Sequence, residues 1–127
     1  MGQQQLLLIV LGVIVVGIAV VVGINLFNAN AVSANRDGVV SDLNNLGVMA
    51  QQFYKKPASM GGGANTFTGW TVPAQLDTTA NGTYTATVSA QSVTLVGLGT
   101  ETGNDGSTKV KATATVTPTA ITVVTNN

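Results

Sequence analysis

An unbroken apolar segment near the start of the chain limits its fold more than any other feature. Residues Leu6 to Ile24 include no charged or hydrogen-bonding side chain, and a helix of about this length, roughly 20 residues, crosses the hydrocarbon core of a bilayer. Burying its fifteen large aliphatic side chains is worth about 1.5–3 kcal/mol each. The sum, tens of kcal/mol, exceeds the stability of a typical domain. We therefore expect that no single soluble chain leaves this segment in water.

The remaining composition narrows the classes of function. Charged residues make up 8% of the chain, and five basic residues balance five acidic ones, so no nucleic-acid partner is predicted. The chain has neither cysteine nor histidine, the residues on which nucleophilic and metal-assisted catalysis most often rely. We predict that the protein is not an enzyme, has no catalytic residues and uses no cofactor. Its abundant Thr, Asn, Gly, Ser and Val indicate an extracellular, sheet-rich polar surface.

The residues before the apolar segment carry no positive charge. They read Met1-Gly-Gln-Gln-Gln, whereas a secretory signal peptide or a simple membrane anchor would place Lys or Arg here. Either the chain departs from the rule that Lys or Arg flanks the cytoplasmic end of a membrane helix, or a basic leader once preceded Met1.

The sequence predicts that the helix continues beyond the apolar segment as far as Lys56. No proline occurs before Pro57, and apolar residues at 39, 43, 46, 50 and 53 alternate steps of four and three, which one helical stripe requires. At about 1.5 Å per residue the helix would be about 75–80 Å long. We divide it into an apolar half, 1–27, and an amphipathic half, 28–56. Polar residues assigned to the other faces of the amphipathic half are Asn35, Arg36, Asp42, Asn44, Asn45, Gln51 and Gln52.

Residues 57–82 are predicted to be a connecting loop, because Gly, Ser, Thr, Asn and Pro dominate this range. Residues 60–64 read Met-Gly-Gly-Gly-Ala and are expected to act as a flexible hinge. The apolar residues of the loop should pack it onto the sheet or the helix, with a ligand site at Trp70 as the alternative. These residues are Phe67, Trp70, Val72 and Leu76.

A period of two begins after the loop and predicts an antiparallel sheet over 83–127. The expected strands cover 83–90, 92–99, 109–117 and 120–125, with a turn over 101–107. One face of this sheet is apolar and needs a cover. The amphipathic half of the helix is the available cover, so the predicted fold class is α+β: a long N-terminal helix packed on a small four-stranded antiparallel sheet, with 83–127 as the head domain.

Two motifs allow both a functional and an ordinary interpretation. Asn81-Gly-Thr83 matches the acceptor pattern for N-glycosylation, but Asn-Gly also forms a plain turn. Glu101, Asn104 and Asp105 group oxygen ligands as a calcium site would need. Residues 103–106, Gly-Asn-Asp-Gly, are equally typical of a turn, and no metal is assigned.

In architecture the whole chain resembles the type IV pilins and their relatives, the pseudopilins. In motif the resemblance covers Met1 to about Phe27. In that family a prepilin peptidase removes a short basic leader just before the apolar helix, the new N-terminus is methylated, and the helices bundle into a filament core. The resemblance implies that Met1 is the processed N-terminus. It also implies storage in the inner (cytoplasmic) membrane before assembly, and the prepilin peptidase and pilus assembly machinery as partners.

The sequence departs from the family pattern at several positions. Gln5 stands where the family usually has a glutamate that pairs with the N-terminal amine of a neighbour. An amide oxygen can still accept a hydrogen bond from an ammonium, more weakly than a carboxylate. Gly23 stands near the family's frequent proline, and the usual C-terminal cysteine pair is absent. An alternative start at Gln3, with Gly2 ending the leader, is closer to some archaeal prepilins.

The expected function is a major pilin-like structural subunit of an extracellular helical filament on the cell surface, serving adhesion, motility or surface attachment. The filament would be a homo-polymer held by helix–helix packing, and Gly23 with Ala19 would allow close approach of helices. The alternatives are a pseudopilin of a secretion-system piston and a plain membrane-anchored extracytoplasmic binding domain. The residues expected in the filament core are Gln5, Leu6, Leu8, Leu11, Val15, Ile18 and Val22.

Overall fold

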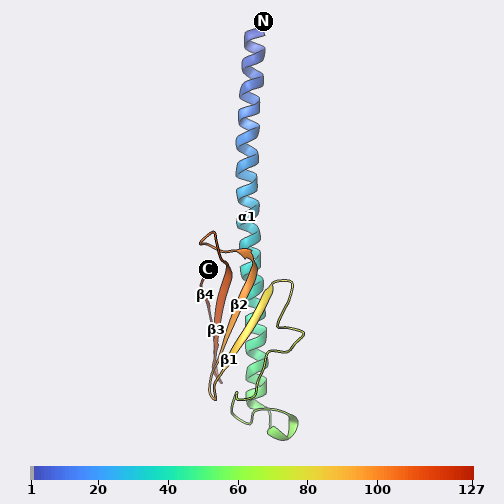
Figure 1. The fold of residues 1–127 in the computed structure, drawn as a ribbon, viewed down its shortest axis with the longest axis vertical. Coiled ribbons are helices and arrows are strands. Elements are labelled where there is room, and N and C mark those ends of the chain that lie inside the picture. The colour runs from blue at the N-terminus through green and yellow to red at the C-terminus, as the bar shows by residue number, and fades with distance from the viewer. Residues whose placement is uncertain (1) are drawn as a thin grey trace. The chain divides into compact units, whose positions relative to one another are not determined.

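The computed structural model describes residues 2–127, which form one long helix followed by a four-stranded sheet (Figure 1). The elements are α1 (Gly2–Lys55), the short 3₁₀ helix η1 (Ala58–Met60), β1 (Gly82–Val88), β2 (Val93–Thr102), β3 (Lys109–Val116) and β4 (Ile121–Thr125). The fold class is α+β, as predicted. The chain divides into two compact units, Met1–Ala31 and Val32–Asn127, which are described separately. Met1, the expected site of processing, lies outside the described residues.

The glycine-rich segment after η1 returns to the end of α1 and satisfies its last carbonyl groups. The backbone N–H groups of Gly63 and Asn65 donate to the carbonyls of Phe53 and Tyr54, both at 2.7 Å. Gly61 ends η1 with φ of 83°, a left-handed conformation that glycine adopts without strain. The segment that we expected to be a hinge is therefore hydrogen-bonded to the helix end.

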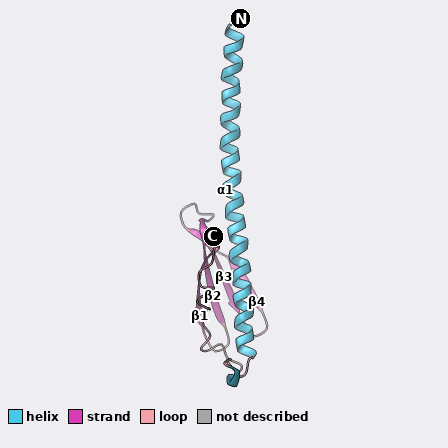
Figure 2. Ribbon diagram, turned by 90° about the vertical axis from the view of Figure 1, so that its right-hand side faces the viewer, coloured by secondary structure: helices cyan, strands magenta, loops and turns pink. Residues whose placement is uncertain are grey.

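The sheet is an antiparallel meander in the order β1-β2-β3-β4. Each strand boundary lies within three residues of its predicted position. β2 extends further than expected, to Thr102, across an irregularity in its pairing with β3 that begins after Leu98. Figure 2 shows the sheet lying along the part of α1 that belongs to the same unit.

The predicted stripe of α1 and the predicted inner face of the sheet form one core. On the helix, Val39, Leu43, Leu46 and Ala50 are buried, and Phe53 packs against them. The loop contributes two buried aromatic residues, as its composition suggested. The loop and sheet residues of this core are Phe67, Trp70, Tyr84, Val93, Leu95, Ala112, Ala114 and Val116.

Two glycines of β2 make room for α1. A Cβ atom at Gly97 would lie 2.8 Å from Val39 Cγ1, and one at Gly99 would lie 2.1 Å from Asn35 Oδ1. Glycine inside a strand commonly marks a place where another backbone approaches closely. In this fold the two glycines determine how closely α1 approaches the sheet.

Candidate assembly surface

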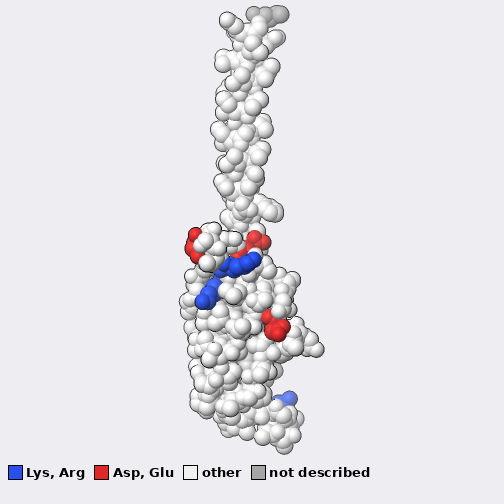
Figure 3. Space-filling model, in the orientation of Figure 1, with Lys and Arg blue, Asp and Glu red and all other residues white. Residues whose placement is uncertain are grey.

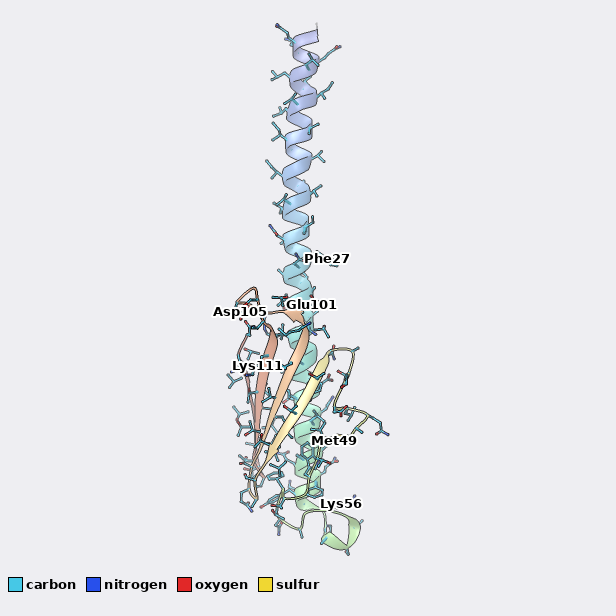
Figure 4. All side chains as sticks on the ribbon, viewed as in Figure 1. Phe27, Met49, Lys56, Glu101, Asp105 and Lys111 are labelled. Carbon is cyan, nitrogen blue, oxygen red and sulfur yellow. The ribbon has the colours of Figure 1, made fainter. Side chains whose placement is uncertain are left out.

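The first part of α1 exposes apolar side chains on all of its faces. Leu6, Leu7 and Leu8 point in three different directions around the helix, and they are 63%, 68% and 67% exposed. Every large aliphatic side chain from Leu6 to Ile24 is at least half exposed, and the sticks in Figure 4 radiate on both sides of the ribbon. A helix that is apolar all round is normally covered by lipid or by other protein.

This surface carries no charge. The first ionisable side chain after Gly2 is that of Arg36, and Figure 3 shows no red or blue on the visible face of the apolar part. α1 is long and apolar enough to cross a membrane, by length and composition. Nothing on the segment would oppose transfer from lipid to a protein environment that is equally apolar.

All the residues predicted for a filament core lie on this surface. Leu8, Leu11 and Val15 start a stripe with helical spacing, and Gln5 is exposed before it. The structure does not set this stripe apart, because residues on the other faces, such as Leu7, are exposed to a similar degree. We therefore treat the whole circumference of the segment as the candidate surface. The predicted core residues beyond Val15 are Ile18 and Val22.

Glycines interrupt the aliphatic surface at intervals. No heavy atom lies within 4 Å of a Cβ placed on Gly12, Gly17 or Gly23. At these positions the backbone of a second helix could approach closely, as at interfaces of small residues between membrane helices.

A second, smaller apolar surface lies in the unit Val32–Asn127. Val48 and Met49 on α1 are 46% and 38% exposed, and Figure 4 labels Met49 on the outer side of the helix. They line a cavity of about 400 Å³ together with Leu46 and Leu76. Polar side chains, those of Asp42, Asn45, Gln52 and Thr79, complete its lining.

A polar cluster that the sequence did not reveal joins α1 to the loop and to β1. The Asp42 carboxylate accepts hydrogen bonds from Tyr84 OH at 2.5 Å, Thr79 Oγ1 at 2.9 Å and Asn81 Nδ2 at 3.1 Å. All three donors lie 37–42 residues further along the chain. This separation explains why spacing along the helix gave no signal for the cluster.

Asn35 corrects the predicted distribution of polar residues around α1. We assigned it to a face away from the stripe, but it is only 8% exposed and lies one helical turn before Val39. Its Nδ2 donates to the carbonyl of Asn81 at 2.8 Å, and its Oδ1 accepts from the N–H groups of Thr100 and Glu101. A buried amide is tolerated on the core face because its polar atoms have partners.

The cluster shifts the titration of its two ionisable members. Burial by itself would raise the pKa of Asp42, but the hydrogen bonds from Tyr84, Asn81 and Thr79 outweigh it and hold the pKa below its ordinary value. Burial, together with the hydrogen bond to Asp42, raises the pKa of Tyr84 well above its usual range. At neutral pH the pair is therefore a carboxylate accepting from a neutral phenol.

The side chain of Asn81, the candidate glycosylation site, is turned toward α1. Its Nδ2, the atom that would carry a glycan, donates to Asp42, and a Cβ at Gly38 would lie 2.5 Å from its Oδ1. The backbone N–H of Asn81 also donates locally, to Thr79 Oγ1 at 3.1 Å. Asn81 lies in a tight turn between Thr79 and Gly82 that is anchored to the helix, and Gly82 and Thr83 already belong to β1.

The side-chain oxygen atoms of Asn104 and Asp105, two of the three candidate calcium ligands, already have partners within the chain. Arg36 Nη2 donates to Asn104 Oδ1 at 2.9 Å. The Asp105 carboxylate accepts from Thr108 Oγ1 and from the N–H groups of Ser107 and Thr108, and these bonds lower its pKa. Glu101 is exposed. Among residues 2–127 no group of three or more acidic side chains is placed to hold a metal ion.

In comparisons with known proteins, no family model, no curated protein and no solved structure matches the chain. The function is therefore inferred from the exposed apolar part of α1 and from the unit Val32–Asn127, which we call the head unit.

Proposed function

We propose that this chain is a type IV pilin-like structural subunit of an extracellular helical filament, held in a membrane by its apolar segment before assembly. One observation carries the proposal. From Leu6 to Ile24 the side chains are apolar on every face and largely exposed, so they need a cover that the described chain does not supply. Lipid provides that cover before assembly, and helices of other copies provide it afterwards.

The exchange of lipid for identical helices explains how one segment can hold the chain in the membrane before assembly and pack the filament core afterwards. Lipid tails and aliphatic side chains are similarly apolar, so helix association depends on close packing rather than on removal of water. Gly12, Gly17 and Gly23 offer places for such packing. Contacts between different surfaces of identical subunits do not close on themselves, and such contacts generate helical filaments.

The sheet gives the filament a water-facing polar surface. Along β1, Thr83, Thr85 and Thr87 are exposed while Tyr84 is buried. β3 alternates in the same way, with Lys109 and Lys111 exposed. In this proposal the surface mediates attachment, and the chain is matured by a prepilin peptidase and exported by a pilus assembly machinery.

Gln5 would act at the buried N-terminus. In a core of helices its amide oxygen would accept a hydrogen bond from the terminal ammonium of a neighbouring copy. A neutral amide makes a weaker bond than a carboxylate and gives the ammonium no counter-charge, but it avoids the burial of a carboxylate.

Replacing Val15 by Asp tests the proposal. On the insertion scale an Asp at a helix centre opposes membrane entry by about 2.5–3.5 kcal/mol, whereas each large aliphatic residue favours it by about 0.3–0.6 kcal/mol. With the fourteen large aliphatic side chains that remain, insertion stays favourable. We expect V15D to fractionate with membranes but to give no fibres by negative-stain microscopy of sheared surface material.

Thr85→Asp is the matched control, because Thr85 is exposed on the sheet and lies outside the apolar segment; its fibres should be normal. Normal fibres from V15D would refute a helix-packed core. Short, rare fibres from the unaltered chain would favour the secretion piston. A membrane-bound monomer with no fibres would favour the anchored binding domain, and mass spectrometry of the N-terminus would show whether a leader has been removed.

A further inference from the structure

One edge of the sheet is covered at its start by the chain itself, and the other is bare along its whole length. At the start of β1, Tyr84 N donates to Asp77 O, and Thr79 N donates to Gly82 O, both at 2.8 Å. The loop also forms an isolated bridge with this strand. β4 pairs with β3 on one side, and within residues 2–127 no hydrogen bond reaches its other side.

The hydrogen bonds at the two ends of the β3–β4 pair show which residues of β4 face outward. Thr117 N donates to Ala120 O, and Asn126 N donates to Lys111 O, both at 2.8 Å. Because bonding alternates along an antiparallel pair, the even-numbered residues of β4 bond to β3. The N–H and C=O groups that point away from the sheet are those of Ile121, Val123 and Thr125.

Nothing in the strand discourages a partner. Its five residues, Ile-Thr-Val-Val-Thr, are all β-branched and uncharged. Natural edge strands are commonly protected by lysine, proline or a bulge, and β4 has none of these. Its outward side chain Val124 is 54% exposed.

We propose that β4 pairs antiparallel with β4 of a second copy of this chain. In the proposed register, Val123 lies opposite Val123 of the second copy, on the two-fold axis. Ile121 then lies opposite Thr125 of the second copy, and Thr125 lies opposite Ile121 of the second copy. Each of these pairs exchanges two hydrogen bonds, so every free group of β4 is used. If the register between the two β4 strands is shifted by two residues, some of the free N–H and C=O groups stay unpaired. If it is shifted by one residue, side chains of the inner face turn outward.

The direction of β4 determines which copies can meet. Gln51 Nε2 donates to Thr117 O, so β4 begins near the C-terminal end of α1. Asp105 N donates to Asn127 Oδ1, and Asn104 is held by Arg36, so β4 ends near the level of Arg36. The two-fold pairing therefore sets the neighbouring parts of α1 in opposite directions.

Copies that share one direction in a single membrane or a single filament cannot pair in this way. Copies in two filaments that run in opposite directions can. The occupant of the edge is thus a second copy in a neighbouring filament, and the contact would bundle filaments. This last step rests on the proposed function, whereas the pairing itself does not.

Cysteine cross-linking tests the register, because the natural chain has no cysteine. Thr122 would lie opposite Val124 of the second copy in a non-hydrogen-bonded pair, with Cα atoms about 4.5 Å apart, within the range of a disulfide. We expect full-length T122C mixed with V124C to give a disulfide-linked dimer on oxidation, at least tenfold more than either variant alone. In each single variant the two cysteines lie diagonally, about 7–8 Å apart.

The mixture is examined first with the full-length chain in detergent and then with sheared filaments of each variant combined. Equal cross-linking with and without mixing, or none in either preparation, would overturn the pairing. If a dimer forms in detergent and no filaments exist, the pairing stands and the proposed function fails. If cross-links form in detergent but not between filaments, bundling is the step that fails.

A proline pair gives a second readout. V123P removes the central free N–H without touching a bond to β3, and proline is tolerated on edge strands. A86P is the control, because Ser89 N donates to Ser92 O, and the same alternation points the N–H of Ala86 away from β2. We expect V123P to give single fibres and A86P to keep bundles. Bundles that persist in V123P would overturn the inference; if V123P fails to fold, the cysteine mixture decides.

Discussion

Asp42 shows how much a single side chain in this protein depends on distant sequence. On the helix it is one of several polar residues, and its neighbours in sequence give it no special role. In the fold it accepts three hydrogen bonds from the loop and β1. Asn35, two turns earlier on the same helix, is fixed in the same way by Asn81 and β2. Through these hydrogen bonds, Asp42 and Asn35 fix the position of α1 along the sheet. Hydrogen bonds have a preferred direction, whereas aliphatic contacts are less directional.

We predict that Asp42 and Tyr84 set the pH range over which the head unit is stable. The lowered pKa of Asp42 contributes stability that is present above its unfolded value and is lost as pH falls through the folded value. The raised pKa of Tyr84 contributes stability that is present below its unfolded value, about 10, and is lost as pH rises through the folded value. Thermal unfolding of the full chain in detergent, followed by circular dichroism from acid to alkaline pH, should show both limits.

Asp42→Asn should weaken the acid limb, to which Asp105 also contributes, and lower stability at pH 7 by about 1–3 kcal/mol, since three donors lose their charged acceptor. Tyr84→Phe should remove the alkaline limb. Asp37→Asn, at an exposed position of the same helix, is the control and should change neither. An acid limb in D42N equal to that of the natural chain would show that Asp42 does not contribute to it.

At the scale of the elements, α1 is the part that sequence describes best. Alternating steps of four and three predicted the buried stripe, because helical periodicity is local. The end of the helix was less readable. Lys55 and Pro57 predicted where it stops, but the capping of its last carbonyls by residues 63–65 depends on how the glycine segment turns back.

We predict that neighbouring substitutions in this cap act in opposite directions. A Cβ at Gly63 would lie only 1.9 Å from the carbonyl oxygen of Thr66, so Gly63→Ala must break the turn and should cost about 1–3 kcal/mol. Ala64 has a positive φ of 51°, which disfavours a side chain; Ala64→Gly should be neutral or stabilising by up to about 1 kcal/mol. Melting temperatures of the two variants check this. A drop in both would contradict the cap geometry.

At the scale of the whole molecule, the chain combines a segment that needs a cover with a unit that has its own core. The unit Val32–Asn127 buries its stripe, loop aromatics and inner sheet face among themselves. The unit Met1–Ala31 buries none of its described large side chains. Assembly can therefore act on the first unit without refolding the second.

We predict that Gly23→Ile separates assembly from membrane storage. No atom lies within 4 Å of a Cβ at Gly23, so the lone chain accommodates the new side chain, and its added apolar surface favours lipid. Close approach of a second helix would be blocked. Fibres counted by microscopy should fall by at least tenfold while membrane fractionation is unchanged. Val20→Ile, an enlargement at a position that is already aliphatic, is the control, and equal fibre counts in the two variants would argue against close packing at Gly23.

Sequence alone determined the features of this protein that repeat locally: the apolar segment, the helical stripe from Val39 to Ala50, and the alternation of β1 and β3. Hydrophobic periodicity depends on residues within a few positions of one another, so these features needed no knowledge of the fold. Only the tertiary structure decided that Asp42 and Asn35 bind partners from the loop and sheet, that residues 63–65 cap α1, and that the loop covers the start of β1 while β4 is bare. Each of these depends on segments far apart in the chain meeting in space, and no local pattern records such a meeting.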